Sequence, residues 1–179
     1  MKNDFSDDEW FLLSSTPAAI GALMSAAAPS GVIGTVKELS ASMKTTVHGL
    51  QSHGDSELIS ALLERSDNWS EAKEKASDYS GRTKQRMSEN GVKNSDDLRA
   101  MVLEDCKTVA GLVDERVSKT EAEAYKDWCA TIAVKVAQAS KEGSILGIGG
   151  TRVSDDEKAL MTEIENALGV TNGKLLTVS

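Results

Sequence analysis

Aromatic residues, prolines, cysteines and histidines are all scarce in this chain of 179 residues. Aromatics make up 4% of it, and proline, cysteine and histidine occur twice each. So little proline excludes a collagen-like or Pro-rich protein, and an apolar share of 40% excludes a strongly disordered one. Two cysteines, Cys106 and Cys129, are too few for a disulfide scaffold and lack the CxxC spacing of a zinc or thioredoxin site. The remaining composition, rich in alanine, leucine, valine and methionine, is typical of a soluble helical protein.

An excess of positive charge is also missing. The net charge of −8 and the pI of about 4.8 argue against a nucleic-acid or anionic-membrane binder. Phe11–Val36 is uncharged, but acidic residues precede it and Pro17 and Pro29 interrupt it. We interpret this stretch as buried packing, not as an export signal or a membrane span. We therefore expect a cytoplasmic protein with no nucleic-acid and no membrane partner.

Helical periodicity dominates the chain, and no alternation typical of a strand persists. Ser6–Glu9 is a capping box that starts a helix near Asp7, whereas Thr16-Pro17 leaves open whether one kinked helix or two stacked helices follow. Thr35–Gln51 has the apolar spacing of an amphipathic helix. A shorter helix is expected after Asp55.

Two further helix starts are marked by capping residues. Asn68 begins a helix whose thin apolar stripe is interrupted at Gly81. We expect this helix to be peripheral, partly exposed and ended by Gly91. Ser154–Glu157 is a second capping box, and Gly169 is the expected C-cap of the helix that follows.

The longest helical pattern, Ser95–Glu142, is too long to be one straight helix. It would run about 70 Å, beyond the width of a domain of this size. Cap signals at Ser118 predict a reversal there, after Val117, into an antiparallel hairpin. This register places Cys106 and Cys129 at the same level, either as a redox staple or, as we favour, as two buried thiols.

These patterns together predict an all-α, single-domain bundle of about six to eight helices around that hairpin. The domain covers residues 1–169, and residues 170–179 are expected to be a mobile tail.

The loop Gly143–Val153 is the most unusual local feature. Its backbone N–H groups and Arg152, next to a helix N-terminus, could hold a small anion. The alternative, which we favour, is structural: Ile145, Leu146 and Ile148 close the core while glycines allow the turn. As candidate ligand-binding residues the loop offers Gly147, Gly149, Gly150, Thr151, Arg152 and Ser154.

A second candidate surface lies on the helix after Asn68. Its apolar stripe is too narrow for a core face and is rimmed by basic residues, the anatomy of a contact patch. A solvated face is the alternative interpretation. The candidate patch consists of Trp69, Lys73, Tyr79, Arg82, Arg86 and Met87.

No constellation for catalysis or metal binding is present. His48 and His53 would lie about 140° apart on a helix, which is poor metal geometry. No serine sits in a GxSxG motif, and neither cysteine has a histidine or a cluster of basic residues beside it. We predict no catalytic residue, no metal and no cofactor.

The segment from Lys141 to Glu157, with the pattern KEGxxLGxGGxxVSxxE, resembles a segment of small, acidic, all-helical prokaryotic proteins to which no activity is assigned. Trp10–Pro17 and Gly31–Glu38 are similar to their N-terminal part. A fainter resemblance, to TerB-like helical domains, is carried by the helix start Ser154–Glu157 before Leu160. The resemblance implies an all-helical fold and no functional residue.

The sequence therefore favours a non-enzymatic interaction or regulatory module, self-associating or bound to a protein partner. The alternative is a small-ligand or anion-binding protein that uses the loop 143–154.

Overall fold

The computed structural model describes residues 1–27, 55–64, 68–142 and 153–170, and these residues form helices and connecting turns without a strand. This confirms the all-α bundle, with six α-helices in the described residues. The chain begins with a short 3-10 helix, η1 Lys2–Asp4. The α-helices that follow are α1 Asp7–Ala27, α3 Glu57–Leu62, α4 Trp69–Glu89, α5 Ser95–Arg116, α6 Lys119–Glu142 and α7 Asp155–Leu168.

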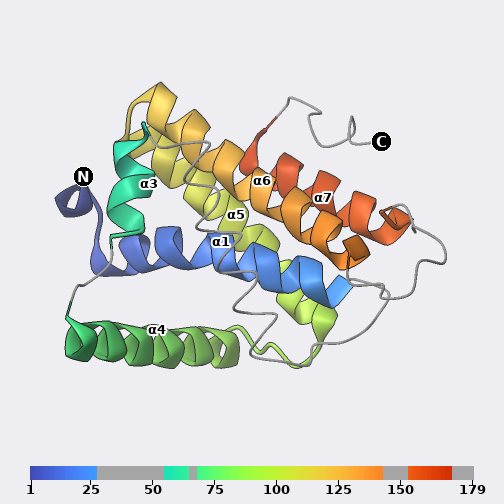
Figure 1. The fold of residues 1–179 in the computed structure, drawn as a ribbon, viewed down its shortest axis with the longest axis horizontal. Coiled ribbons are helices and arrows are strands. Elements are labelled where there is room, and N and C mark those ends of the chain that lie inside the picture. Colours follow the sequence, from blue (N-terminus) through green and yellow to red (C-terminus); the bar gives the residue numbers. More distant parts are fainter. Residues whose placement is uncertain (28–54, 65–67, 143–152, 171–179) are drawn as a thin grey trace.

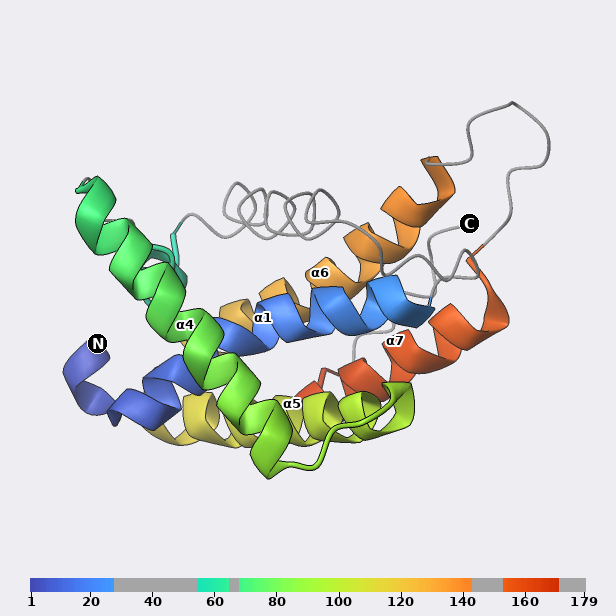
Figure 2. The same cartoon turned by 90° about the horizontal axis from the view of Figure 1, so that it is seen from below.

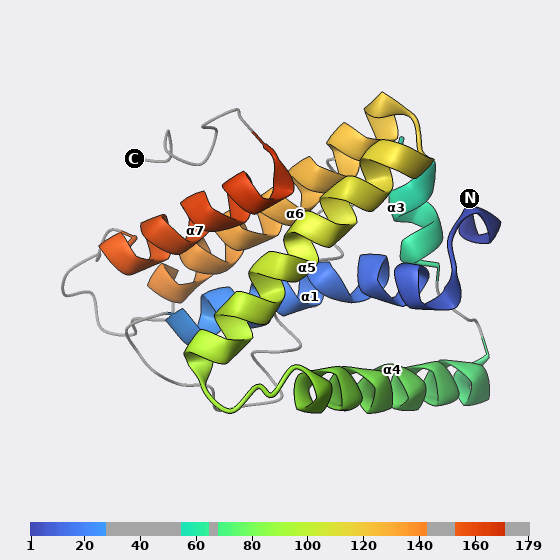
Figure 3. The same cartoon turned by 180° about the vertical axis from the view of Figure 1, so that it is seen from behind.

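Four of these helices build the core. α1 packs against α5, α6 and α7, and α7 packs against α5 and α6, while α3 packs against α6 (Figure 1). Seen from behind, α5 crosses α1 and α6, and α7 lies beside α6 (Figure 3). One cluster of buried side chains joins all five helices, with members such as Leu13, Leu58, Val109, Trp128 and Ile164.

The long helical pattern divides as predicted. α5 ends at Arg116, Val117 is its C-cap with extended backbone, and α6 begins at Lys119. The Ser118 hydroxyl accepts a hydrogen bond from the Glu121 backbone N–H at 3.3 Å, which is the expected N-cap contact. The reversal therefore arises from local capping chemistry that the sequence displays.

α1 is one continuous helix, although Pro17 lies inside it. Its start is the predicted capping box, in which the Ser6 N–H donates to the Glu9 carboxylate at 2.7 Å and the Glu9 N–H donates to the Ser6 hydroxyl at 3.2 Å. The second helix start at Thr16 is not used, since the Thr16 hydroxyl donates instead to the Leu12 carbonyl.

Pro17 removes one backbone hydrogen bond from α1, and a side chain of α6 replaces it. A proline has no N–H, so the carbonyl four residues earlier, that of Leu13, loses its helical donor. The Tyr125 hydroxyl on α6 donates to this carbonyl at 2.8 Å, within the core. The internal proline is thus accommodated by a tertiary hydrogen bond.

α3 is held at its N-terminus by a carboxylate from α6. The Glu121 side chain accepts hydrogen bonds from the Ser56 hydroxyl at 2.6 Å and from the Glu57 and Leu58 backbone N–H groups at 3.1 Å. Burial raises the pKa of Glu121, but the three hydrogen bonds lower it by more, so it lies below its ordinary value. The first turn of α6 therefore anchors α3.

The last helix is capped as predicted at both ends. Ser154 and Glu157 form the capping box of α7, and Gly169 closes it in the left-handed conformation with φ 68°. The Val170 N–H donates to the Glu165 carbonyl at 3.0 Å, so this residue belongs to the cap. The rest of the expected tail, residues 171–179, lies outside the described residues. The expected helix Thr35–Gln51 also lies outside them.

Candidate functional site

α4 is the peripheral helix that the sequence predicts. It runs from Trp69 to Glu89 and ends before Gly91, as expected, and Gly81 lies inside it because a helix tolerates an isolated glycine at a cost of only about 1 kcal/mol. None of its residues is buried. Figure 2 shows it crossing α1 obliquely, with its N-terminal end directed away from α1 and α5.

The C-terminal half of α4 is docked on α1 through a stack of side chains. The Arg82 guanidinium donates to the Asp8 carboxylate at 2.6 Å and lies 4.2 Å from the centre of the Phe11 ring. The Tyr79 ring also packs on Phe11, with 5.4 Å between ring centres. Burial in this contact raises the pKa of Tyr79 to about 12.

One turn further along, Arg86 attaches α4 to α5. Its guanidinium donates to the Asp105 carboxylate at 2.6 Å. Burial raises the pKa of Asp105, and this outweighs the lowering by Arg86. Asp105 is therefore a buried carboxyl whose charged form is disfavoured by burial and favoured by Arg86.

The N-terminal half of α4 is largely exposed. Asn68 caps the helix by accepting from the Ser70 N–H at 2.9 Å, and the helix then leaves the bundle with Trp69 83% exposed. From Trp69 to Asp78, only Ala72 is partly covered. A tryptophan this exposed is unusual, because its large apolar ring gains free energy on burial.

The structure therefore divides the candidate patch in two. Tyr79, Arg82 and Arg86 lie on the docked half and make intramolecular contacts, and Met87 is partly buried there. Trp69 and Lys73 lie on the exposed half.

Three residues that the sequence did not single out complete the docked half. Asp8, Phe11 and Asp105 receive the α4 side chains, although they are remote in sequence. In the sequence, Asp8 lies in the first turn of a helix, where acidic residues are common, and Phe11 lies in an uncharged segment, so neither residue indicates a contact with α4. Only the tertiary arrangement brings them to α4.

The glycine-rich loop is the other candidate. Gly147, Gly149, Gly150, Thr151 and Arg152 lie outside the described residues, as do Ile145, Leu146 and Ile148. Ser154 is described, and its N–H and hydroxyl both donate to the Glu157 carboxylate at 2.8 Å. Its donors are thus used by the cap of α7.

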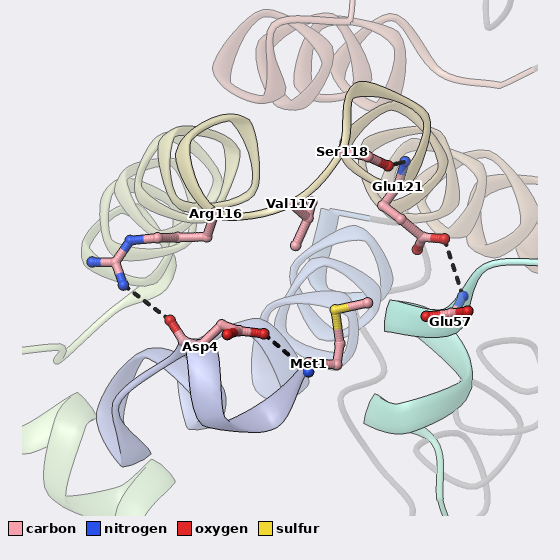
Figure 4. Close-up of a pocket in the computed structure, with 7 residues that line it drawn as sticks. All are labelled: Met1, Asp4, Glu57, Arg116, Val117, Ser118 and Glu121. Atoms are coloured by element: carbon pink, nitrogen blue, oxygen red, sulfur yellow. Dashed lines mark hydrogen bonds and ion pairs between the residues drawn. The ribbon is translucent and has the colours of Figure 1, made fainter.

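An open hollow lies where the chain reverses between α5 and α6 (Figure 4). Its charged groups contact one another: the Met1 amine lies 2.9 Å from the Asp4 carboxylate, and Arg116 donates to the Asp4 carbonyl at 2.9 Å. Glu121, on its other side, is bound to α3. We assign no ligand to this hollow.

The two cysteines are free and buried on facing helices of the hairpin. Burial and, to a smaller extent, the charge of nearby Asp105 together raise the pKa of Cys106 to about 12. Burial also raises the pKa of Cys129 well above its usual range, with a further increase from Cys106. Thiols held in this protonated form are poor nucleophiles, which agrees with buried packing groups.

In the described part of the chain, no group of three or more His, Cys, Asp or Glu residues could hold a metal ion. His48 and His53 lie outside that part.

α1 is long and apolar enough to cross a membrane by length and composition alone. Half of its most apolar window is buried in the bundle, and Leu13, Ile20 and Met24 have no exposed surface. In this structure α1 is a core helix.

Comparison with known proteins adds no relative to these observations. No family model matches the chain, and neither curated proteins nor solved structures give a match. The resemblance of residues 141–157 to prokaryotic helical proteins accordingly stays a prediction, and the functional argument rests on α4.

Proposed function

We propose that this protein is a non-enzymatic interaction module that presents the N-terminal half of α4 to a protein partner. The supporting observation is Trp69, which is 83% exposed on a helix with no buried residue. We name the surface formed by Trp69, Ala72, Lys73, Lys75 and Ala76 the α4 tip.

The apolar stripe of the α4 tip continues the docked face of the same helix. At 100° per residue, Trp69, Ala72 and Ala76 lie in line with Tyr79 and Met87. The stripe is covered by α1 in its C-terminal half and extends past that contact in its N-terminal half. An amphipathic stripe extended beyond its intramolecular contact is suited to bind a second helix.

The rest of the molecule acts as a scaffold in this proposal. The Arg82–Asp8 and Arg86–Asp105 ion pairs fix the direction of α4 relative to the core. A surface held on a rigid element loses less conformational entropy on binding than a mobile one.

The test is photo-crosslinking in cells that naturally make the protein. A photoreactive phenylalanine analogue at position 69 should form protein adducts, and the same analogue at Lys107, an exposed position on α5, should not. Equal adduct formation at both positions, or none at position 69, would contradict the proposal.

A further inference from the structure

We infer that the partner of the α4 tip is an acidic amphipathic helix, and not a second copy of this chain or a lipid surface. The inference rests on the proposed function and adds the chemistry of the partner. It follows from the distribution of charge around α4.

Both edges of the apolar stripe carry a lysine. Trp69, Ala72 and Ala76 span about 60° of the helix circumference at 100° per residue. Lys73 lies about 40° beyond one edge, and Lys75 about 60° beyond the other. Both lysines are exposed.

The acidic residues of the same segment lie elsewhere on the helix. Glu71 is about 100° from the nearer edge of the stripe, and Glu74 and Asp78 are on the opposite side. The α4 tip therefore presents an apolar centre between two positive charges. A helix with apolar residues flanked by Glu or Asp is its electrostatic complement.

A second copy fits this surface poorly. When two α4 tips pair through their stripes, the lysines at the edges of one face those of the other, and like charges in register disfavour pairing. An anionic membrane also fits poorly, because the exposed segment 69–78 holds three acidic residues against two lysines.

The net charge of −8 does not prevent an acidic partner from binding here. Charges are screened over about 8 Å at physiological salt, and the N-terminal end of α4 is directed away from α1 and α5 (Figure 2). Within the exposed segment, Lys73 and Lys75 are the charges that lie nearest to the apolar stripe.

The experiment uses the full chain and two designed helical peptides of about three heptads, each with a leucine seam and a fluorescent label. One peptide has Glu beside the seam, and the other has Lys. Binding is measured by fluorescence anisotropy at low and at high salt. We expect the Glu peptide to bind at least tenfold more tightly than the Lys peptide, and less tightly at high salt.

Variants locate the contact. Trp69→Ala and the double substitution Lys73→Glu/Lys75→Glu should each weaken binding of the Glu peptide at least tenfold, and the double substitution should strengthen binding of the Lys peptide. Lys84→Glu/Lys93→Glu, an equal charge change at exposed positions off the α4 tip, should leave both affinities unchanged. Far-UV circular dichroism confirms that each variant is folded.

Other results would overturn the inference. These are equal affinity for both peptides, no binding of either, binding unaffected by Lys73→Glu/Lys75→Glu, or preferential binding of the α4 tip to phosphatidylserine vesicles or to a second copy in sedimentation. Adducts at position 69 in cells would then still support the proposed function, whereas their absence would remove both.

Discussion

Replacing Tyr125 with phenylalanine should destabilise the protein because of Pro17. The substitution keeps the ring and removes the hydroxyl that donates to the Leu13 carbonyl at 2.8 Å. Pro17 supplies no N–H, so that carbonyl is left buried without a donor, at a cost of about 1–3 kcal/mol. Burial raises the pKa of Tyr125 well above 10, with a further contribution from Cys129, so the hydroxyl is present as a donor throughout the neutral range.

The dependence on Pro17 is measured with a double-mutant cycle. Pro17→Ala restores a backbone N–H that can donate to the Leu13 carbonyl, so Tyr125→Phe should then cost at least about 1 kcal/mol less. The free energy of unfolding is obtained from urea denaturation followed by circular dichroism. Tyr79→Phe, a matched hydroxyl deletion on α4, should have the same effect in both backgrounds. An equal cost of Tyr125→Phe in the wild-type and in the Pro17→Ala background would refute the reasoning.

Three further substitutions test the contacts around the core. Arg86→Leu should cost about 2–3 kcal/mol in urea unfolding at pH 7, because it leaves the Asp105 carboxylate buried without its partner. Burial raises the pKa of Asp105, so this carboxyl favours the folded state most at low pH and less as pH rises through that pKa. The loss of unfolding free energy caused by Arg86→Leu should therefore be smaller at pH 5 than at pH 7. An equal loss at both pH values would argue against a buried charge. Glu121→Ala should speed hydrogen exchange in α3 about fivefold, which is the effect of losing a cap worth about 1 kcal/mol. The pKa of Glu121 is lowered, so the protection of α3 in the wild type should be present above the ordinary carboxyl pKa and be lost as pH falls through the lowered value. Gly81→Ala should stabilise by about 1 kcal/mol and Gly169→Ala should destabilise by a similar amount in thermal unfolding, because both positions have open space but only Gly169 has a positive φ, of 68°. A shift of the same sign for both would show that backbone conformation does not decide their effect.

Features governed by neighbours in sequence could be predicted. The capping boxes at Ser6 and Ser154, the N-cap at Asn68, the reversal at Ser118 and the left-handed Gly169 all follow from residues within one helical turn. For each of these features, the hydrogen-bonding groups or the glycine that form it are all present in the local sequence. The all-α class and the helix ends at these caps could therefore be predicted from the sequence.

Features governed by distant neighbours could not be predicted. Asp8 meets Arg82 at a separation of 74 residues, and Tyr125 meets the Leu13 carbonyl at a separation of 112. Pro17 signals that a carbonyl needs another donor, but nothing local tells which side chain supplies it. For the same reason the apolar stripe of α4 could be recognised as a contact face, but its division into a docked half and an exposed half could not.

The central claim is that Trp69 is exposed in the isolated protein and covered in the cell. Hydroxyl-radical footprinting compares the oxidation of the three tryptophans in the purified chain and in cells that naturally make it. In the purified chain, Trp69 at 83% exposure should be oxidised far faster than Trp128 at 1%, which is the buried internal reference. In cells we expect Trp69 to be protected at least several-fold relative to a partly exposed residue of the bundle, Trp10. Oxidation of Trp69 at the same relative rate in both settings would contradict the account.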